Sequence, residues 1–197
     1  MANRIDYRKL RDFEGFNLKG HVPAAGRSGV TVGMGIDLGQ RNEQDLRRAG
    51  LTPMEYDRLS PFLGRERDDA QKALDCFKYL YRKDFEIAED TWRKLRDDYV
   101  KSRIDPMIRR YNASLAPGRL RFDLLPTEIQ TVIASVTWQY GTPAAETPVF
   151  WAHVVDQDWD AALSELRDFG DAYQTRHTKE AVFMEAGVER LRPDGQR

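Results

Sequence analysis

Residues 13–39 read FEGFNLKGHVPAAGRSGVTVGMGIDLG. The composition of this stretch differs from that of the rest of the chain. Asp, Glu, Lys and Arg make up 32% of all residues, yet the only acids in the stretch are Glu14 and Asp37, one near each end. Seven of the chain's 14 glycines lie in it. The stretch therefore has the composition of a β-containing segment with space beside its backbone, and not of a solvated helix.

Within this stretch, Val30–Asp37 has the period-two pattern of a half-buried strand. The even positions are apolar, and the odd positions carry Thr31, Gly33, Gly35 and Asp37. Glycine on a strand face often marks a close approach by another chain or a ligand, so the open face is predicted to be a bare floor. In a flat strand Thr31 and Asp37 would be about 20 Å apart. They can share a site only if the chain bends, which the two glycines permit.

Before this strand, Glu14–Leu18 has the pattern of a helix end that turns into a first strand. A hairpin between the two strands would bring Glu14 towards Thr31. Two carboxylates that face one cleft can divide the work of glycoside hydrolysis, one as a proton donor and the other as an ionised group that orients water. From spacing alone, structural roles also fit: Glu14 as a cap or solvated charge, the glycines as a bulge or turn, and Asp37 as a turn residue.

The rest of the chain is predicted to be mostly helical. Thr52–Glu55 is a capping box with Pro at the first helical position. Residues 87–111 carry apolar side chains at helical spacing, and Pro106 predicts a break or kink in this helix. Residues 127–140 show the i, i+3, i+4, i+7, i+11 pattern of a buried helix that ends at Gly141, and residues 158–169 repeat such a pattern.

The bulk properties exclude several classes. A net charge of −1 gives no case for nucleic acid or a membrane surface as a partner. No apolar run approaches the roughly 20 residues that span a bilayer, and no secretory signal is visible at the N-terminus. A single cysteine excludes an internal disulfide. The three histidines lack metal-site spacing and no dinucleotide or phosphate-loop motif occurs, so we expect no metal and no cofactor.

The order of motifs resembles that of phage-type lysozymes. Glu14-Gly15 followed by Thr31-Val32-Gly33-Met34-Gly35 is similar to their active-site hairpin, and Gly33-Met34-Gly35-Ile36-Asp37-Leu38-Gly39-Gln40 resembles the version in the muramidase domain of pesticin and related antibacterial effector domains. Further matches in the same order are Trp138-Gln139-Tyr140-Gly141, Phe150, Trp159-Asp160-Ala161-Ala162, Tyr173-Gln174-Thr175-Arg176 and Glu180. Together they cover most of the chain.

This resemblance implies an α+β, predominantly α-helical, lysozyme-like fold. We expect a single domain over residues 1–197, with a small N-terminal β-hairpin lobe at about 14–65. The larger helical body would combine the N-terminal helix with about residues 66–197. Such a domain is expected to be a monomer.

By position, the resemblance implies that Glu14 is the general acid, Thr31 positions the attacking water, and Asp37 is the second carboxylate. Gly33, Gly35 and Gln139 would line the saccharide cleft, and Arg176 would bind substrate or brace Glu14. The chain departs from the phage enzymes in one respect. The acid or Cys that follows their catalytic Glu is replaced here by Pro23, so the second catalytic role must belong to Asp37 or be missing.

The implied activity is hydrolysis of the β-1,4 bond between N-acetylmuramic acid and N-acetylglucosamine in peptidoglycan. A lytic transglycosylase and a non-catalytic wall-binding module remain alternatives. With no signal peptide, the protein would reach the periplasm or wall of a target bacterium through a secretion system, bacteriocin uptake or phage lysis. The pesticin-like pattern favours an antibacterial toxin domain, which can be part of a longer chain and would imply an immunity protein as a partner.

Overall fold

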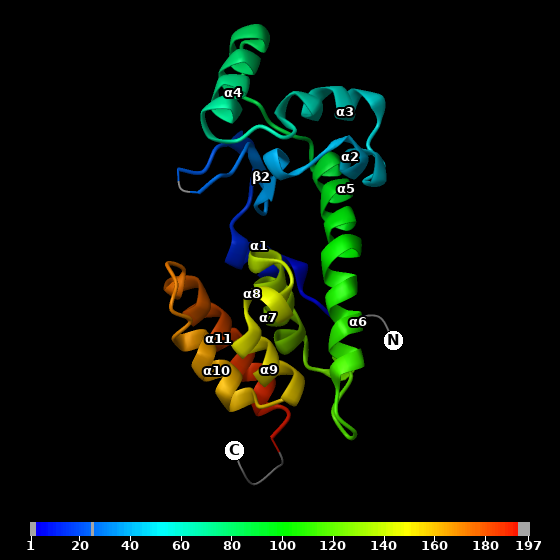
Figure 1. Cartoon of the computed structure of the whole chain (residues 1–197), viewed down its shortest axis with the longest axis vertical. Helices are drawn as coiled ribbons and strands as arrows, with labels where there is room; N and C mark the ends of the chain where they lie inside the picture. The colour runs from blue at the N-terminus through cyan, green and yellow to red at the C-terminus, as the bar shows by residue number, and fades with distance from the viewer. Residues whose placement is uncertain (1–2, 25, 193–197) are drawn as a thin grey trace. The chain divides into compact units, whose positions relative to one another are not determined.

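The computed structural model describes residues 3–24 and 26–192, which fall into two compact units (Figure 1). One unit contains the chain up to Glu14 and from Lys101 onward, and the other runs from Gly15 to Val100. Helices dominate, and a small antiparallel sheet with the strand order β1-β2-β3 lies in the second unit. The predicted α+β, predominantly helical class is confirmed.

The unit Gly15–Val100 contains the sheet and four α-helices among its described residues. Its elements are β1 (Asn17–His21), β2 (Thr31–Gly33), β3 (Ile36–Asp37), α2 (Glu43–Arg48), α3 (Pro53–Leu59), α4 (Arg67–Tyr81) and α5 (Glu89–Tyr99), with short 3-10 turns at Leu38–Gln40 and Ser60–Phe62. The lobe predicted at 14–65 ends before α4, whereas this compact unit continues to Val100.

The prediction of one strand over Val30–Asp37 is wrong, because the chain turns back on itself within it. β2 and β3 form a tight hairpin in which Thr31 is paired with Asp37. The turn depends on Gly33 and Gly35, whose φ angles of +65° and +87° are strained for any residue with a side chain. The bend that the two glycines were expected to permit therefore occurs at these glycines, and it makes Thr31 and Asp37 direct neighbours across the hairpin.

The central strand β2 is buried on both faces, which the half-buried pattern did not predict. All three residues of β2 are buried. The indole of Trp92 lies against Gly33, where an added Cβ would be 2.2 Å from its Cε3 atom. Phe16 packs edge-on against the same ring at 5.5 Å between centroids. Gly33 therefore provides a close approach for a core side chain and not an open floor.

Residues beyond 65 belong with the sheet because they extend and cover it. The backbone of β1 is hydrogen-bonded to the segment 85–87: Gly20 N–H donates to Phe85 at 2.9 Å, and Ile87 N–H donates to Leu18 at 3.0 Å. The ring of Phe85 packs on Phe62 at 4.3 Å and on Phe77 of α4 at 5.2 Å. This aromatic cluster forms the core that joins α4 to the sheet.

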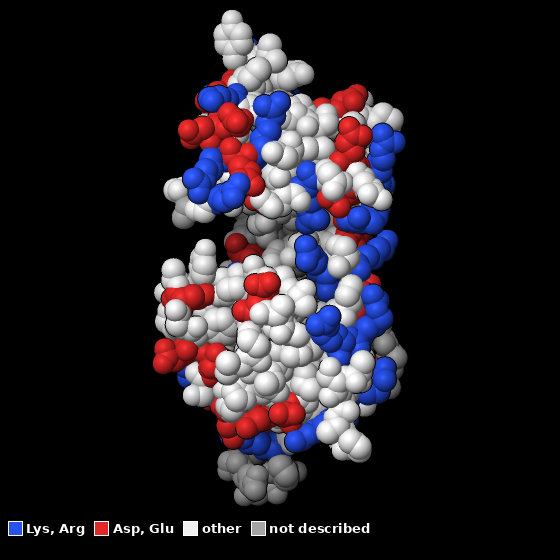
Figure 2. All heavy atoms as spheres, viewed as in Figure 1, with Lys and Arg blue, Asp and Glu red and all other residues white. Residues whose placement is uncertain are grey.

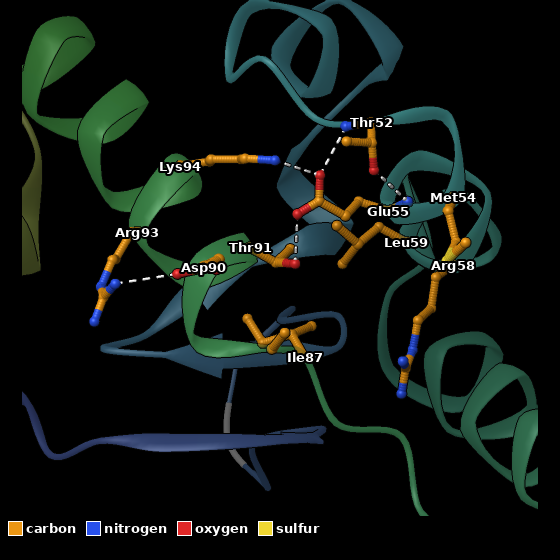
Figure 3. A pocket seen from close by; sticks show the side chains of 11 residues that line it. Thr52, Met54, Glu55, Arg58, Leu59, Ile87, Asp90, Thr91, Arg93 and Lys94 are labelled. Carbon is orange, nitrogen blue, oxygen red and sulfur yellow. Dashed lines mark hydrogen bonds and ion pairs between the residues drawn. The ribbon is translucent and has the colours of Figure 1, made fainter.

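The capping box predicted at Thr52–Glu55 is confirmed, and it also links α3 to α5 (Figure 3). The carboxylate of Glu55 accepts hydrogen bonds from Thr52 N–H at 2.7 Å, Thr91 Oγ1 at 2.8 Å and Lys94 Nζ at 2.6 Å. Burial alone would raise the pKa of Glu55, but the hydrogen bond from Lys94, followed by those from Thr52 and Thr91, lowers it to about 2. Glu55 therefore holds the two helices together as an anion.

The other unit is a set of helices around α7. Its elements are α1 (Tyr7–Glu14), α6 (Asp105–Ser114), a 3-10 turn at Phe122–Leu124, α7 (Thr127–Tyr140), α8 (Pro143–Glu146), α9 (Pro148–Asp156), α10 (Trp159–Arg167) and α11 (Gln174–Glu189). Every residue from Ile129 to Trp138 is buried, so α7 is the central helix against which α1 and α11 pack. Its predicted bounds, with Gly141 as the stop, are confirmed.

At the break or kink predicted at Pro106, the α-helical pattern is interrupted. A π-helical turn at Val100–Ile104 separates α5 from α6, which begins at Asp105, one residue before the proline. Proline has no N–H to donate, and its ring clashes with the carbonyl four residues earlier, here that of Ser102. The wider π turn removes this conflict.

Charges of both signs are interspersed over the surface of the unit Gly15–Val100 (Figure 2). Several of them form ion pairs, such as Lys78 with Asp84 at 2.9 Å and Lys72 with Asp69 at 3.1 Å. These side chains are exposed, so each pair contributes little to stability. These charged side chains therefore form a solvated surface.

A pair of alanine substitutions separates the two functions of the turn glycines. Gly33→Ala and Gly35→Ala both place a Cβ on a residue with a positive φ. The Cβ at residue 33 would clash with the Trp92 ring, whereas the Cβ at residue 35 would have no atom within 4 Å beyond its chain neighbours. We expect Gly35→Ala to lower the free energy of unfolding by about 1 kcal/mol, and Gly33→Ala to lower it by about 1–3 kcal/mol more. Urea unfolding followed by Trp fluorescence measures both; equal losses would contradict the packing of Trp92.

Glu55→Gln should lower the free energy of unfolding by about 1–2 kcal/mol at pH 7, because Lys94 loses its charged partner. The folded-state pKa of Glu55 lies below its ordinary value of 4.5, so its stabilisation is present above pH 4.5 and is lost as the pH falls towards 2. Urea midpoints of the two proteins should therefore converge near pH 2. Glu86→Gln, at an exposed position, is the control and should leave the midpoint unchanged; a difference that persists at pH 2 would contradict the ion-pair account.

Candidate active site

Glu14 is the last residue of α1, and its helix fixes where its side chain points. Asp6 begins the helix by accepting hydrogen bonds from the backbone N–H groups of Arg8 and Lys9 at 2.9 and 3.0 Å. Leu10 is fully buried and anchors α1, and Gly15, at a φ of +72°, ends it. The side chain of Glu14 is only 9% exposed.

Arg176 of α11 holds the carboxyl group of Glu14 with two parallel hydrogen bonds. Nη1 donates to Oε2 at 2.9 Å and Nη2 donates to Oε1 at 2.5 Å. The predicted role of Arg176 as a brace for Glu14 therefore fits its position. Its substrate-binding role stays a prediction, since the guanidinium group is itself mostly buried.

The pKa of Glu14 is raised from 4.5 to about 7. Burial is the largest cause, and the charge and hydrogen bonds of Arg176 act in the opposite direction. The effect of burial prevails, and the charge of Glu180, a second carboxylate that also pairs with Arg176, is a smaller cause that raises the pKa of Glu14. A carboxyl group with a pKa near 7 can donate a proton at neutral pH.

Arg176 is in turn fixed by groups from two helices. Its Nε donates to Glu180 at 3.0 Å, one turn further along α11. Its Nη2 also donates to Ser135 of α7, to the hydroxyl at 2.8 Å and to the backbone carbonyl at 3.2 Å. Every nitrogen of the guanidinium group therefore has an acceptor.

The network continues away from Glu14 to His177, whose side chain is completely buried. Its Nδ1 lies 2.8 Å from Glu180, and its Nε2 lies 2.9 Å from the hydroxyl of Tyr140 and 3.3 Å from Asp171. The sequence did not identify Ser135 or His177 as site residues. The i, i+3 spacing of His177 and Glu180 was the available signal for one of them.

Thr31 and Asp37 lie in the unit Gly15–Val100, and their side chains share one face because directly paired strand residues do so. Oδ1 of Asp37 accepts hydrogen bonds from the backbone N–H groups of Gly29 at 3.0 Å and Gly39 at 2.8 Å. The Thr31 hydroxyl donates to the Gly29 carbonyl at 3.3 Å. No described residue donates to Oδ2 of Asp37 in the structure. The hairpin thus holds a hydroxyl and a carboxylate side by side.

Gly29 and Gly39 form the loop that orients Asp37, and the sequence prediction did not include them. A Cβ on Gly29 would lie 2.2 Å from the Arg65 carbonyl oxygen, and one on Gly39 would lie 2.4 Å from the same atom. These contacts are with backbone, which cannot move aside. Both positions therefore need glycine so that their N–H groups can reach Asp37.

The remaining predicted site residues differ in their surroundings. Gly33 lies beneath Trp92, whereas Gly35 is exposed in the hairpin turn. Gln139 is in the last turn of α7, and both polar atoms of its side chain are buried with no hydrogen-bond partner among the described residues. An unpaired buried amide is costly, so Gln139 has unused capacity to bind a polar group. The substrate-binding roles of all three stay predictions.

Glu14 belongs to one compact unit, and Thr31 and Asp37 belong to the other. Within each unit the predicted residues have the environments described above. The predicted meeting of the two carboxylates across one cleft stays a prediction.

A cavity of about 600 Å³ in the unit Gly15–Val100 lies around Glu55 (Figure 3). Apolar Leu59 and Ile87 line it together with charged side chains. Both of its carboxylates are paired, Glu55 with Lys94 at 2.6 Å and Asp90 with Arg93 at 3.1 Å. Among residues 3–24 and 26–192, no cluster of side chains could hold a metal ion, and no helix is long and apolar enough to cross a membrane.

Comparison with known proteins gives one family. The family model described as pesticin, the C-terminal bacterial toxin homologue of phage lysozyme, matches residues 4–160. A comparison with curated proteins finds no match. The family match includes Glu14, Thr31, Asp37 and Gln139, and it extends over most of the chain. The chain therefore belongs to the pesticin family of bacterial toxin homologues of phage lysozyme.

Proposed function

We propose that this protein is a muramidase that hydrolyses the β-1,4 bond between N-acetylmuramic acid and N-acetylglucosamine in peptidoglycan. The observation that carries the proposal is the buried carboxyl group of Glu14, whose pKa of about 7 suits a general acid. Membership of a family of phage lysozyme homologues supports the same chemistry. The substrate is the glycan strand, and no other partner is needed for the reaction.

On the leaving-group side of the scissile bond, Glu14 protonates the glycosidic oxygen as the bond to the leaving sugar breaks. Arg176 holds the carboxyl group in one orientation through its two hydrogen bonds. General acids of this kind contribute roughly 10²–10⁴-fold to a rate. Gln139, with its unpaired amide, would bind a polar group of the saccharide.

As this bond breaks, water attacks the anomeric carbon from the opposite face of the sugar. The Thr31 hydroxyl and the Asp37 carboxylate, neighbours across the hairpin, would hold this water, and Asp37 would accept its proton. Gly35 is exposed in the turn beside them and would line the cleft. Gly33 would contribute its backbone groups to the same cleft. Such an inverting reaction needs room for water between the carboxyl groups of Glu14 and Asp37, so we expect them to be roughly 6.5–9.5 Å apart in the working enzyme.

The biological setting that fits best is an antibacterial toxin domain. The description of the family as bacterial toxins supports this setting. The domain would act as a monomer in the periplasm or wall of a target bacterium, after delivery by a secretion system, bacteriocin uptake or phage lysis. A producer of such a toxin would need an immunity protein.

Glu14→Gln should abolish turbidity clearing of purified cell walls, with a loss of at least about 100-fold, because an amide cannot donate the proton. Circular dichroism and co-sedimentation with walls should match those of the unchanged protein. Asp12→Asn, which alters an exposed carboxylate on the same helix, is the matched control and should clear walls normally. Undiminished clearing by Glu14→Gln would sink the assignment of Glu14.

Asp37→Asn should also reduce clearing by at least about 100-fold, because water is no longer activated.

The product distinguishes the mechanisms: ¹H NMR early in the reaction should show the α-anomer of the new reducing end, since the β-bond is inverted. The β-anomer would indicate retention, and a 1,6-anhydro product would indicate a lytic transglycosylase. Wall binding without any released sugar would instead support a non-catalytic module. Asp90→Asn, at an exposed position in the same unit, is the control for Asp37→Asn and should clear walls normally.

A further inference from the structure

The formal charges behind Glu14 balance only when Glu14 is protonated. Arg176 and a protonated His177 carry two positive charges, and Glu180 and Asp171 carry two negative charges. An ionised Glu14 adds an unbalanced negative charge to this largely buried cluster. We propose that Glu180 and His177 are positioning residues that act through Arg176 to keep Glu14 in its proton-donating form, an inference that rests on the proposed function of Glu14 as the general acid.

Arg176 forms hydrogen bonds with two carboxyl groups, those of Glu14 and Glu180. If Glu14 were its only partner, a buried bidentate arginine would hold Glu14 as an anion. Glu180 takes the Nε hydrogen bond at 3.0 Å, so the positive charge of Arg176 is already compensated. The charge of Glu180 is accordingly one of the causes that raise the pKa of Glu14.

Glu180 stays ionised although it is completely buried. Three donors surround its carboxylate: the Ser135 hydroxyl at 2.5 Å, Arg176 Nε at 3.0 Å and His177 Nδ1 at 2.8 Å. Burial alone would raise the pKa of Glu180, but the hydrogen bond from His177 and the charge of Arg176 lower it. Of the two carboxyl groups around Arg176, Glu180 therefore keeps the negative charge, and Glu14 keeps the proton.

His177 has the surroundings of an imidazolium. Nδ1 faces Glu180 on its own helix, and Nε2 faces Asp171 and the Tyr140 hydroxyl, which itself donates to Asp171. Burial would lower the pKa of His177, but the hydrogen bond and charge of Glu180, followed by those of Asp171, raise it. The Phe169 ring, stacked at 4.3 Å, covers the imidazole.

The test is the alkaline limb of the pH profile of kcat/KM on soluble glycan fragments, which falls as the general acid loses its proton. Glu180→Gln keeps the shape of the side chain but frees Arg176 for Glu14, so the limb should move to lower pH by about one unit. His177→Asn keeps a donor towards Glu180 but removes a positive charge, so the limb should move to higher pH. Tyr140→Phe removes a hydrogen bond without changing charge and should move the limb least.

Opposite shifts support the proposal, because loss of stability alone cannot move the limb in two directions. An unmoved limb in a folded Glu180→Gln protein, or shifts of the same sign, would overturn it. If Glu180→Gln does not fold, the upward shift of His177→Asn decides. ¹³C NMR of the Glu14 carboxyl, assigned by its absence in Glu14→Gln, measures the same titration without activity. An inactive but normally titrating protein would contradict the muramidase assignment alone.

Discussion

The hydrogen bonds of the Arg176 guanidinium group are the interactions on which the helical unit and its candidate catalytic residue, Glu14, both depend. The group joins Glu14 of α1, Ser135 of α7 and Glu180 of α11. A buried cation is tolerated only when acceptors surround it, so the helices must hold their registers for the cluster to exist. The same requirement fixes the orientation of Glu14, because its two oxygens complete the set of acceptors.

The hairpin solves a different problem, which is to hold a carboxylate with backbone groups alone. Asp37 is oriented by the N–H groups of Gly29 and Gly39, and both glycines lie against the Arg65 carbonyl. The Gly-Ile-Asp-Leu-Gly order of the family pattern therefore has a local physical reason. Its second glycine permits the close approach of three backbone segments, and only the aspartate and its neighbour Thr31 present functional groups.

Regular helices were predictable from the sequence because their signals are local. The ladder from Ile129 to Tyr140, the cap at Thr52 and the break before Pro106 each follow from side chains within a few residues of one another. The hairpin was not predictable in the same way. A period-two pattern is identical for a continuous strand and for one that turns at glycines, and glycine permits either conformation. The packing of Gly33 against Trp92, which is distant in the sequence, is not visible in the pattern.

The candidate site also contains some residues that the sequence identified and others that it did not. Glu14, Thr31 and Asp37 were identified by motif order, but their partners were not, because Ser135 and His177 acquire their importance only when α7 and α11 pack together. Gly33 was expected to face open space and instead supports an indole ring. Sequence pattern thus identifies groups able to do chemistry, whereas the residues that set their protonation and orientation become visible only in three dimensions.

The two carboxyl groups are therefore controlled by different means, and this difference matches the division of labour in a two-carboxylate glycosidase. Glu14 is surrounded by side-chain charges whose sum is neutral only while it is protonated, so its state responds to any change in Glu180 or His177. Asp37 is held by peptide N–H groups, which have no charge to lose or gain. The first kind of environment suits a proton donor, because it keeps the carboxyl group protonated at neutral pH. The second suits a group that orients water, because it fixes the position of the carboxylate.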